Sequence, residues 1–335
     1  MEVLGNTFYY DWEVSLMVFL QSHLGSFGES LANFFSMFGE EMLIVALVGF
    51  IYWCYDKEFG KFIGINLLVA NVWNPMLKNV FDRRRPYMDN PQIKCLRQVS
   101  SEGDVNDVLT QGFSFPSGHS TAAAAAYCSM PVYKKRKKWL TFAAVFVTLM
   151  VGISRVCLGV HYPTDVIVGW ALGLLAIWLV SSVMKKFKTK WKAFLIVLLI
   201  CLPGFWFCDS TDYYTSYGSL AGMFLAVLFE EKYVRFENTR NFWISVLRLA
   251  GGVAIFFGLN ALLKLPFSSE FLASGTPMSH LVRTVRYALV LFTDMGLYPM
   301  TFKLIKEKDK KEKAGEEVRP EAEAGQEVKA EEPEK

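Results

Sequence analysis

The sequence is poor in histidine and lacks cysteine pairs at metal-binding spacing. Its four histidines are few enough to examine one by one, and its six cysteines are scattered at positions 54, 95, 128, 157, 201 and 208, with no CxxC motif. This pattern argues against a disulfide framework or a cysteine-bound metal, and favours cysteines that act as small core residues. The opening MEVLGNTFYYDWEV lacks a basic leader and a small-residue cleavage site, so we expect no cleaved signal peptide.

The C-terminal end lacks aromatic residues. From Lys306 onward there are eleven acidic and eight basic residues, so this segment carries a charge of −3 and the rest of the chain +6. Such a segment cannot bury enough apolar surface to fold, and we expect residues 306–335 to form a disordered, charged tail. A partner-binding tail is the alternative.

Apolar residues are abundant: they make up 53% of the 335 residues, and the mean hydropathy is +0.26, which is too high for an ordinary soluble protein of this length. A membrane-spanning helix needs roughly 20 mostly apolar residues. The candidate spans are 40–55, 61–78, 116–132, 139–156, 164–184, 193–208, 217–231, 242–263 and 279–303. Before them, the stretch DWEVSLMVFLQSHL predicts an amphipathic helix along the interface, within an N-terminal segment 1–39.

Basic connectors predict the orientation of these spans. The runs KKRKK (134–138), KKFKTKWK (185–192) and KEKDKKEK should be cytoplasmic, and the last of these places the tail on that side. The connectors 79–115, 156–163, 209–216 and 264–278 then lie on the opposite, non-cytoplasmic face. We therefore expect a multi-pass protein, embedded in the cell membrane, with its unusual polar residues on that outer face.

Two of the predicted spans carry packing signals. Asn66, Asn71 and Asn74 fall at helical spacing in 61–78, and polar residues of this kind usually face the interior of a helix bundle. The alanine run 122–126 lets a neighbouring helix approach closely. Both features predict that these two helices lie inside the bundle.

Three polar motifs lie at span ends on the predicted outer face. KNVFDRRRP supplies Lys78 and Arg85, PSGH supplies Ser117, Gly118 and His119, and SRVCLGVHYPTD supplies Arg155, His161 and Asp165. Any one of the cations alone is explained by snorkelling to lipid headgroups. Three cations beside two histidines indicate an anion instead, because guanidinium groups match phosphate oxygens.

The PSGH motif opens the predicted helix. Ser117 can cap that helix or donate its hydroxyl, and Gly118 allows close approach of a ligand to the backbone. Free N–H groups and the positive end of the helix dipole then favour a phosphate.

The histidines complete this interpretation. Asp165 lies four residues after His161, so its carboxylate can hold one ring nitrogen and leave the other free to attack phosphorus. His119 is placed to protonate the leaving oxygen. The structural alternatives are a helix N-cap pair for His161 and Asp165, and a structural hydrogen bond for His119.

Together the motifs resemble the three-part signature of the type 2 phosphatidic acid phosphatase superfamily, which also includes vanadium-dependent haloperoxidases and bacterial acid phosphatases. The signature positions here are Lys78, Arg85 and Pro86, then Pro116 to His119, then Ser154, Arg155, His161 and Asp165. The resemblance covers residues 40–185 and implies an all-α fold with a six-helix phosphatase core. Residues 186–305 then add about three transmembrane helices.

The resemblance also implies residue roles. His161 is the nucleophile, Asp165 its orienting partner, and His119 the general acid and later the base. Lys78, Arg85, Ser117, Gly118 and Arg155 bind phosphate, with no metal and no cofactor. Arg83 and Arg84 lie outside the pattern, and we expect them to snorkel. The alternative is contact with a second phosphate or with lipid headgroups.

The function expected from these motifs is an integral-membrane lipid phosphatase. Its substrate would be a membrane lipid phosphate such as a polyprenyl diphosphate, phosphatidic acid, phosphatidylglycerol phosphate or a sphingoid-base phosphate, and no nucleic acid. The alternative is a non-catalytic protein that binds or transports lipid phosphates on the same fold. The sequence specifies neither the lipid nor the oligomeric state.

Overall fold

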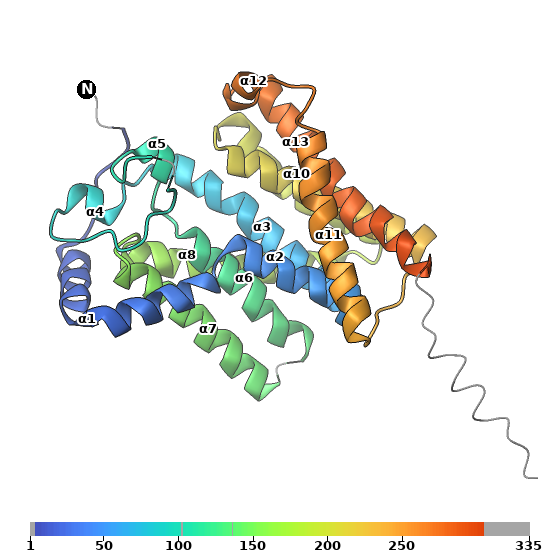
Figure 1. The fold of residues 1–335 in the computed structure, drawn as a ribbon, viewed down its shortest axis with the longest axis horizontal. Coiled ribbons are helices and arrows are strands. Elements are labelled where there is room, and N and C mark those ends of the chain that lie inside the picture. Colours follow the sequence, from blue (N-terminus) through green and yellow to red (C-terminus); the bar gives the residue numbers. More distant parts are fainter. Residues whose placement is uncertain (1–3, 102, 136, 305–335) are drawn as a thin grey trace, which may run out of the picture.

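The computed structural model describes residues 4–101, 103–135 and 137–304, and the expected tail lies outside them. The described residues form thirteen α-helices (Figure 1), with one isolated bridge between Asn6 and Arg83. The helices are α1 (Asp11–Met37), α2 (Glu41–Phe50), α3 (Lys57–Phe81), α4 (Pro86–Asp89), α5 (Val108–Gln111), α6 (Gly118–Tyr133), α7 (Lys138–Cys157), α8 (Pro163–Lys186), α9 (Lys190–Cys201), α10 (Thr211–Phe229), α11 (Phe242–Leu262), α12 (Ser269–Ala273) and α13 (Pro277–Phe292).

The helix α6 lies between α3, α7 and α8, at the centre of the part formed by residues 40–185. Its alanine run is buried on all sides, and two glycines of α8 let that helix approach its backbone. A Cβ atom at Gly169 would lie 2.8 Å from the Ser117 carbonyl oxygen, and one at Gly173 would lie 2.7 Å from Ala124 Cβ. The close packing predicted from the alanine run is thus confirmed.

Polar side chains of α3 face this centre, as predicted. Asn66 donates to the Ser129 hydroxyl at 2.9 Å, and Asn74 donates to the Pro116 carbonyl and the Thr121 hydroxyl. Each bond connects α3 to α6 or to the turn before it. A buried amide costs free energy unless it finds such partners, so these bonds fix the register of the two helices.

All nine predicted segments are helical, but fewer than nine are long and apolar enough to cross a membrane. Among the described residues, α7, α8 and α11 meet both criteria. A fourth candidate is α1 together with Glu41–Tyr55, a pair bent by 47°. The prediction of nine spans is therefore corrected to three or four by length and composition, because the other helices are shorter or interrupted by polar residues.

The helices after α8 pack beside residues 40–185 rather than around them. The helix α10 contacts both α3 and α13, and α13 crosses it at two glycines. A Cβ atom at Gly218 would lie 2.2 Å from the Thr284 carbonyl oxygen, and one at Gly222 would lie 2.2 Å from that of Ala288. Only glycine permits this approach of two helix backbones.

A buried cluster of charges joins these added helices to α3. The ammonium group of Lys61, 4% exposed, contacts Glu58 at 2.8 Å, Glu230 at 2.9 Å and Glu231 at 3.1 Å. Lys57 contacts the same fully buried Glu230 at 2.8 Å. Removing one partner from such a cluster leaves an unpaired buried charge, so it ties the two parts together.

Candidate active site

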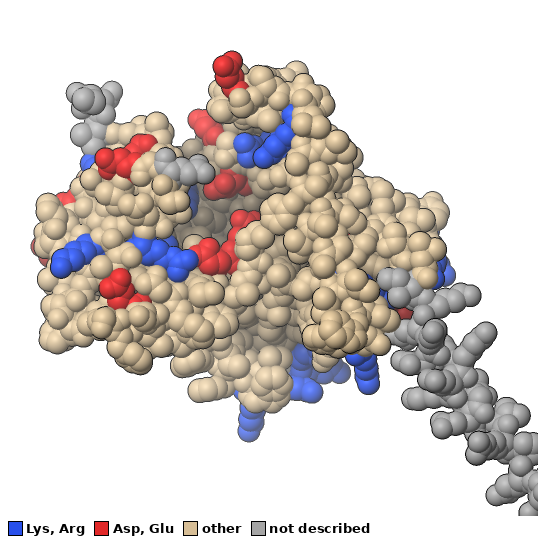
Figure 2. Space-filling view, in the orientation of Figure 1, with Lys and Arg blue, Asp and Glu red and all other residues tan. Residues whose placement is uncertain are grey.

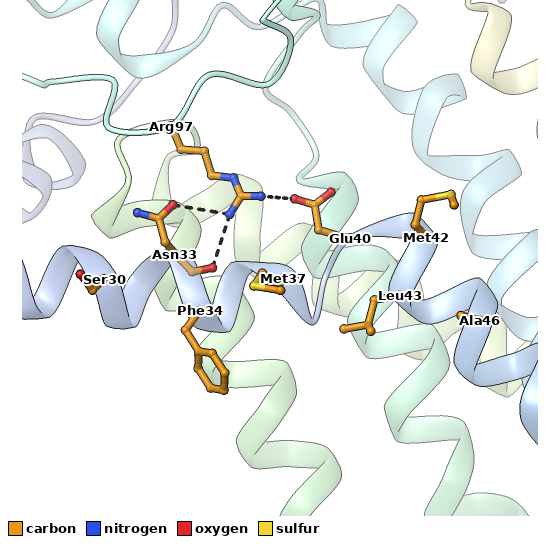
Figure 3. A pocket seen from close by; sticks show the side chains of 9 residues that line it. All are labelled: Ser30, Asn33, Phe34, Met37, Glu40, Met42, Leu43, Ala46 and Arg97. Atoms are coloured by element: carbon orange, nitrogen blue, oxygen red, sulfur yellow. Dashed lines mark hydrogen bonds and ion pairs between the residues drawn. The ribbon is translucent and has the colours of Figure 1, made fainter. Parts of the chain in front are cut away.

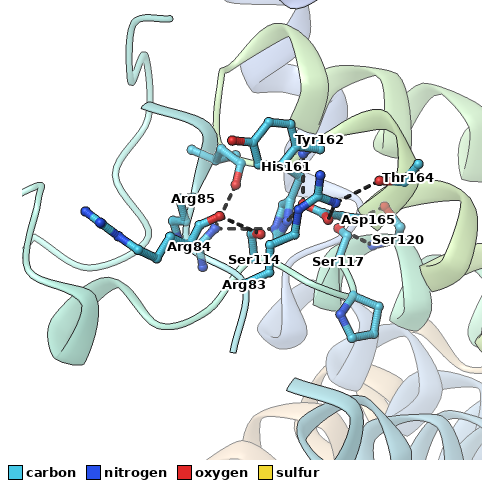
Figure 4. A network of polar contacts seen from close by, with 12 residues as sticks. Arg83, Arg84, Arg85, Ser114, Ser117, Ser120, His161, Tyr162, Thr164 and Asp165 are labelled. Carbon is cyan, nitrogen blue, oxygen red and sulfur yellow. Dashed lines mark hydrogen bonds and ion pairs between the residues drawn. The ribbon is translucent and has the colours of Figure 1, made fainter. Parts of the chain in front are cut away.

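The three motifs meet at one end of the bundle, where α6 and α8 begin and α3 and α7 end (Figure 4). The Ser117 N–H donates to the Asp165 carbonyl at 3.0 Å, which joins the second motif to the third. Arg85 of the first motif donates to the Val160 carbonyl at 3.0 Å. The first and third motifs are therefore in direct contact, although the contacting residues are 75 positions or more apart in the sequence.

His161 lies at the centre of this arrangement, in the loop between α7 and α8, and is 2% exposed. Its Nδ1 atom is 3.5 Å from Asp165 Oδ2, and its Nε2 atom is 3.5 Å from Arg85 Nη1. The first of these contacts falls short of hydrogen-bond geometry. Catalytic hydrogen bonds are often long in unliganded enzymes and shorten when substrate binds.

The charge state of His161 follows from its surroundings. Burial, followed by the nearby cations Arg85, Arg155 and Lys78, holds the pKa of the His161 imidazole well below its ordinary value. The side chain is therefore neutral at physiological pH, and a neutral ring nitrogen is the form that can attack phosphorus. His119 also lies within electrostatic range of His161.

Asp165 has a structural role as well as a place beside His161. It stands at the third position of α8, after Pro163 at the first, and its Oδ2 accepts from the Tyr162 N–H at 2.8 Å. This is a capping-box contact, so the helix start fixes the carboxylate. The N-cap interpretation and the His161-orienting interpretation describe the same side chain.

Arg83 departs from expectation, because it is 1% exposed rather than snorkelling to the surface. Its Nη1 donates to Asp165 Oδ1 at 2.6 Å and its Nη2 to Glu13 Oε2 at 2.9 Å. The guanidinium also lies 3.9 Å from the ring centroid of Tyr162 and 4.7 Å from that of Phe8. Arg83 therefore bridges two buried carboxylates, and a charge held in this way has no reason to reach the surface. Arg84, also expected to snorkel, pairs with Asp89 at 3.1 Å instead.

Glu13 is itself buried and fully bonded. Its Oε1 accepts from the N–H of Thr164 at 3.0 Å and from its hydroxyl at 2.6 Å, and its Oε2 accepts from the Tyr10 N–H as well as from Arg83. The N-terminal helix α1 is thereby attached to the first turn of α8. The chain of contacts runs from Glu13 through Arg83 and Asp165 to His161.

Arg85 is fixed by backbone carbonyls on two segments. Its Nε and Nη2 donate to the Gln111 carbonyl at 3.0 and 2.8 Å, its Nε also contacts that of Gly112, and its Nη1 contacts that of Val160. Because no carboxylate neutralises it in these contacts, its charge remains available to an anion. This preorganisation suits the binding of phosphate oxygens.

The second motif forms the start of α6. Ser117 is the N-cap, and its hydroxyl oxygen accepts from the N–H of Ser120 at 3.4 Å and from its hydroxyl at 3.0 Å. The Ser117 hydroxyl proton stays free to be donated to a ligand. Space is open at Gly118, where a Cβ atom would approach nothing closer than Asn74 Oδ1 at 3.7 Å. The positive end of the helix dipole therefore faces the site, while Pro116 precedes the cap.

His119 also has a carboxylate neighbour. Its Nε2 lies 3.5 Å from Oε1 of Glu40, a residue in the break between α1 and α2, and that same oxygen accepts from Arg97 at 2.6 Å. The break packs tightly on His119, because a Cβ atom at Gly39 would lie 2.8 Å from His119 Cβ. Each histidine of the site thus has one carboxylate 3.5 Å from a ring nitrogen, and for His119 too this contact falls short of hydrogen-bond geometry.

The remaining two predicted cations, Arg155 and Lys78, add to the positive charge of the site. Arg155 is 2% exposed and donates to the Ser36 hydroxyl at 2.6 Å, while its Nε atom is buried without a hydrogen-bond partner. Lys78, at the end of α3, lies within electrostatic range of Arg85, Arg155 and Asp165. All eight predicted site residues are therefore brought to one end of the bundle.

Five further residues around the site were not identified from the sequence as part of it. Ser36, Glu40 and Arg83 contact predicted residues directly, whereas Glu13 contacts Arg83 and Arg97 contacts Glu40. Two of the five, Glu13 and Ser36, lie in residues 1–39, which the sequence suggested only as an interfacial segment, and Glu40 is the first residue of the predicted span 40–55. The available signal was an acidic residue, Glu13, placed among apolar residues of an amphipathic helix.

The extension borders the site on another side. Figure 2 shows a hollow between the part that carries α4 and α5 and the part that carries α10, α12 and α13, with charged side chains on its walls. Asp212, at the start of α10, lies within electrostatic range of Lys78. The added helices therefore contribute charge close to Lys78, one of the cations predicted to bind phosphate.

Comparisons with known proteins assign most of the chain to one family. Residues 59–189 match the PAP2 superfamily, and residues 214–310 match the family described as "PAP2 superfamily phosphatase, transmembrane extension". The first range contains all eight predicted site residues. The second begins within α10, so the added helices belong to a recognised extension of this family.

Several relatives and a solved structure are similar to this chain. A decaprenylphosphoryl-5-phosphoribose phosphatase of Mycobacterium tuberculosis is 36% identical over 176 residues, covering 51% of this chain and 90% of that protein. Phosphatidylglycerophosphatase B of Bacillus subtilis is 45% identical over 89 residues, which are 24% of this chain and 44% of the relative, so the match spans less than half of it.

The solved structure is that of a transmembrane PAP2-type phosphatidylglycerolphosphate phosphatase from Bacillus subtilis. It shares 26% sequence identity with a TM-score of 0.39, over 54% of this chain and 90% of that one. The coverage of the mycobacterial relative, together with the two family matches, establishes the relationship. The chain belongs to the PAP2 superfamily, as a multi-pass integral membrane member of its transmembrane phosphatase branch and a homologue of lipid phosphate and diphosphate hydrolases.

Proposed function

We propose that this protein is an integral-membrane phosphatase that hydrolyses a phosphate monoester or diphosphate of a lipid through a phosphohistidine intermediate. The observation that carries the proposal is the position of His161, with Nδ1 3.5 Å from Asp165 Oδ2 and Nε2 3.5 Å from Arg85 Nη1. Nδ1 faces a carboxylate that can accept a hydrogen bond from its N–H group. Nε2 faces the cation expected to hold the phosphoryl oxygens.

In the first step, the lone pair of His161 Nε2 attacks phosphorus and forms a P–N bond. The bond between phosphorus and the lipid oxygen breaks, and its electron pair goes to that oxygen, which takes a proton from His119. Asp165 stabilises the positive charge that develops on the His161 ring. The lipid alcohol, or lipid monophosphate from a diphosphate, is released.

In the second step, water attacks the phosphohistidine while His119 accepts a proton from that water. The P–N bond breaks, its electron pair returns to Nε2, and inorganic phosphate is released. His119 acts first as the acid and then as the base, because the first step leaves it deprotonated. The proton balance closes over the two steps.

Charge on the phosphoryl oxygens is balanced by Lys78, Arg85 and Arg155, together with the Ser117 hydroxyl and the backbone at Gly118. Positioned donors of this kind each contribute about 3 kcal/mol to stabilising a transition state. Because Arg85 is already fixed by backbone carbonyls and Arg155 by the Ser36 hydroxyl, these two groups need little reorganisation when charge develops. This arrangement is expected to act without a metal ion.

The substrate class is supported by the relatives. Proteins similar to this chain are named as phosphatases of phosphatidylglycerophosphate, decaprenylphosphoryl-5-phosphoribose and lipid A, and as an undecaprenyl-diphosphatase. These substrates share a phosphate group attached to a lipid anchored in the bilayer. A site at the ends of membrane helices suits such a substrate, because its hydrocarbon part can remain in the membrane.

The test is release of inorganic phosphate by the purified protein in detergent, from a panel of polyprenyl, glycerol and sphingoid-base phosphates with EDTA present. We expect turnover of at least one lipid, its loss in His161→Ala, and its retention in His23→Ala, an exposed histidine of α1. Full activity of His161→Ala would refute the assigned nucleophile. Binding of a lipid phosphate without any release would favour a non-catalytic protein.

We also propose that the site faces away from the cytoplasm, on the argument from the basic connectors. The exposed residues Asp104 and Lys137 lie on opposite sides in that topology. With Asp104→Cys, an impermeant thiol reagent should label intact cells above the level of the parent chain. With Lys137→Cys it should not, and the reverse pattern would overturn the orientation.

A further inference from the structure

A groove follows the bend between α1 and α2, next to the proposed general acid. Its volume is about 890 Å³, and Figure 3 shows the side chains that line it. Phe34 and Met37 at the end of α1, with Met42 and Leu43 at the start of α2, form an apolar wall. These four side chains are between 41% and 58% exposed.

The other end of the groove is polar and adjoins the site. Arg97 and Glu40 both line it, and their ion pair of 2.6 Å is drawn in Figure 3 together with the contact of Arg97 with Asn33. The same Glu40 oxygen is 3.5 Å from His119 Nε2. One carboxylate thus separates the apolar wall from the histidine that protonates the leaving group.

The groove is also placed where a bilayer lipid can reach it. The bent pair formed by α1 and Glu41–Tyr55 is long and apolar enough, taken together, to be a membrane span. Its bend carries the groove, so the apolar wall lies along a helix pair that is a candidate membrane span.

We propose that this groove holds the hydrocarbon chain of the substrate, the chain that continues from the oxygen protonated by His119. This inference rests on the proposed function and adds to it the path of the lipid. A general acid must be within hydrogen-bond reach of the leaving oxygen. The lipid begins at that oxygen, and the apolar surface adjoining His119 through Glu40 is the wall of this groove.

The test narrows the groove without touching the site. Leu43→Trp places a larger side chain on the wall, and Val45→Trp makes the same change two residues away, outside the groove, at similar exposure (41% and 44%). The substrates are dioleoyl and dihexanoyl phosphatidic acid, which have the same phosphate and different chain lengths. The measured quantity is the ratio of kcat/KM for the long-chain lipid to that for the short-chain lipid.

We expect Leu43→Trp to lower this ratio about ten-fold, the effect of displacing roughly two methylene groups from apolar contact, and Val45→Trp to leave it unchanged. An unchanged ratio in Leu43→Trp, or an equal fall in Val45→Trp, overturns the groove while the parent's turnover upholds the proposed function. Failure of the parent chain to hydrolyse any lipid of the wider panel refutes the proposed function, and the assignment of the groove with it. Elution of both variants at the parent's volume in gel filtration verifies that they are folded.

Discussion

Replacing Arg83 by methionine tests whether the network behind His161 holds the site together. The change removes a cation that contacts Asp165 at 2.6 Å and Glu13 at 2.9 Å, both of them fully buried carboxylates. Methionine keeps much of the side-chain volume, so the main effect is electrostatic. Two negative charges are then left in the interior without the cation that joins them.

The magnitude follows from the two charged hydrogen bonds that are lost. At roughly 1.5–3 kcal/mol each, they amount to about the 3–5 kcal/mol typical of breaking a buried ion pair. We expect the melting temperature of Arg83→Met in detergent to fall by roughly 5–10 °C. The kcat for a lipid phosphate should fall at least about ten-fold, because Asp165 loses its shortest contact and no longer holds the His161 ring.

Adding Glu13→Gln to Arg83→Met makes the test specific. The double variant removes one of the two unpaired carboxylates, so it should melt at a higher temperature than Arg83→Met although more contacts have been deleted. Such recovery is a coupling energy between neighbouring residues. If Arg83→Met melts and turns over like the parent, or if the two substitutions simply add, the bridging role assigned to Arg83 is wrong.

Three other predictions concern the site and the extension. The pKa of His161 lies well below its ordinary value, so the loss of kcat/KM that follows protonation of His161 should occur below about pH 6.5, after correction for the substrate's own ionisation near pH 6. A His161-dependent loss of kcat/KM above about pH 6.5 would contradict this. Glu40→Gln should lower kcat about ten-fold for a lipid phosphate. It should lower kcat less for para-nitrophenyl phosphate, because the leaving oxygen of that substrate needs little protonation by His119. An equal loss of kcat for both substrates would argue that Glu40 does not act through His119. Glu230→Gln should lower the free energy of unfolding by about 3 kcal/mol, because Lys61 and Lys57 lose a buried partner, and it should leave KM unchanged. An unaltered melting temperature would show that the charge cluster does not join the extension to the core.

Local features of the sequence were enough to place the helices and the eight predicted site residues. Pro163 begins α8 and Asp165 caps it, Ser117 caps α6, and both positions follow from residue preferences within one helical turn. Apolar stretches of sufficient length located all nine expected helices. The same stretches predicted too many membrane spans, because several of the helices are short or interrupted by polar residues.

The support behind the site depended on packing between distant segments. Glu13 meets Thr164 across 151 positions, and Ser36 meets Arg155 across 119. Helical periodicity indicates which face of α1 is apolar, but it does not indicate which helix that face will contact. Arg83 was misjudged for the same reason, since a cation next to a membrane helix is expected to snorkel until a buried carboxylate is known to be within reach.

The sequence by itself therefore determined the candidate site residues, because its three motifs put two histidines, a carboxylate and three cations at fixed positions on helix ends and loops. Only the tertiary structure decided what holds them in place and where a lipid chain can lie. The bend at residues 38–40 puts Glu40 against His119 and leaves an apolar groove beside it. That relation arises from the angle between two packed helices, which side-chain interactions between distant segments set and no short motif encodes.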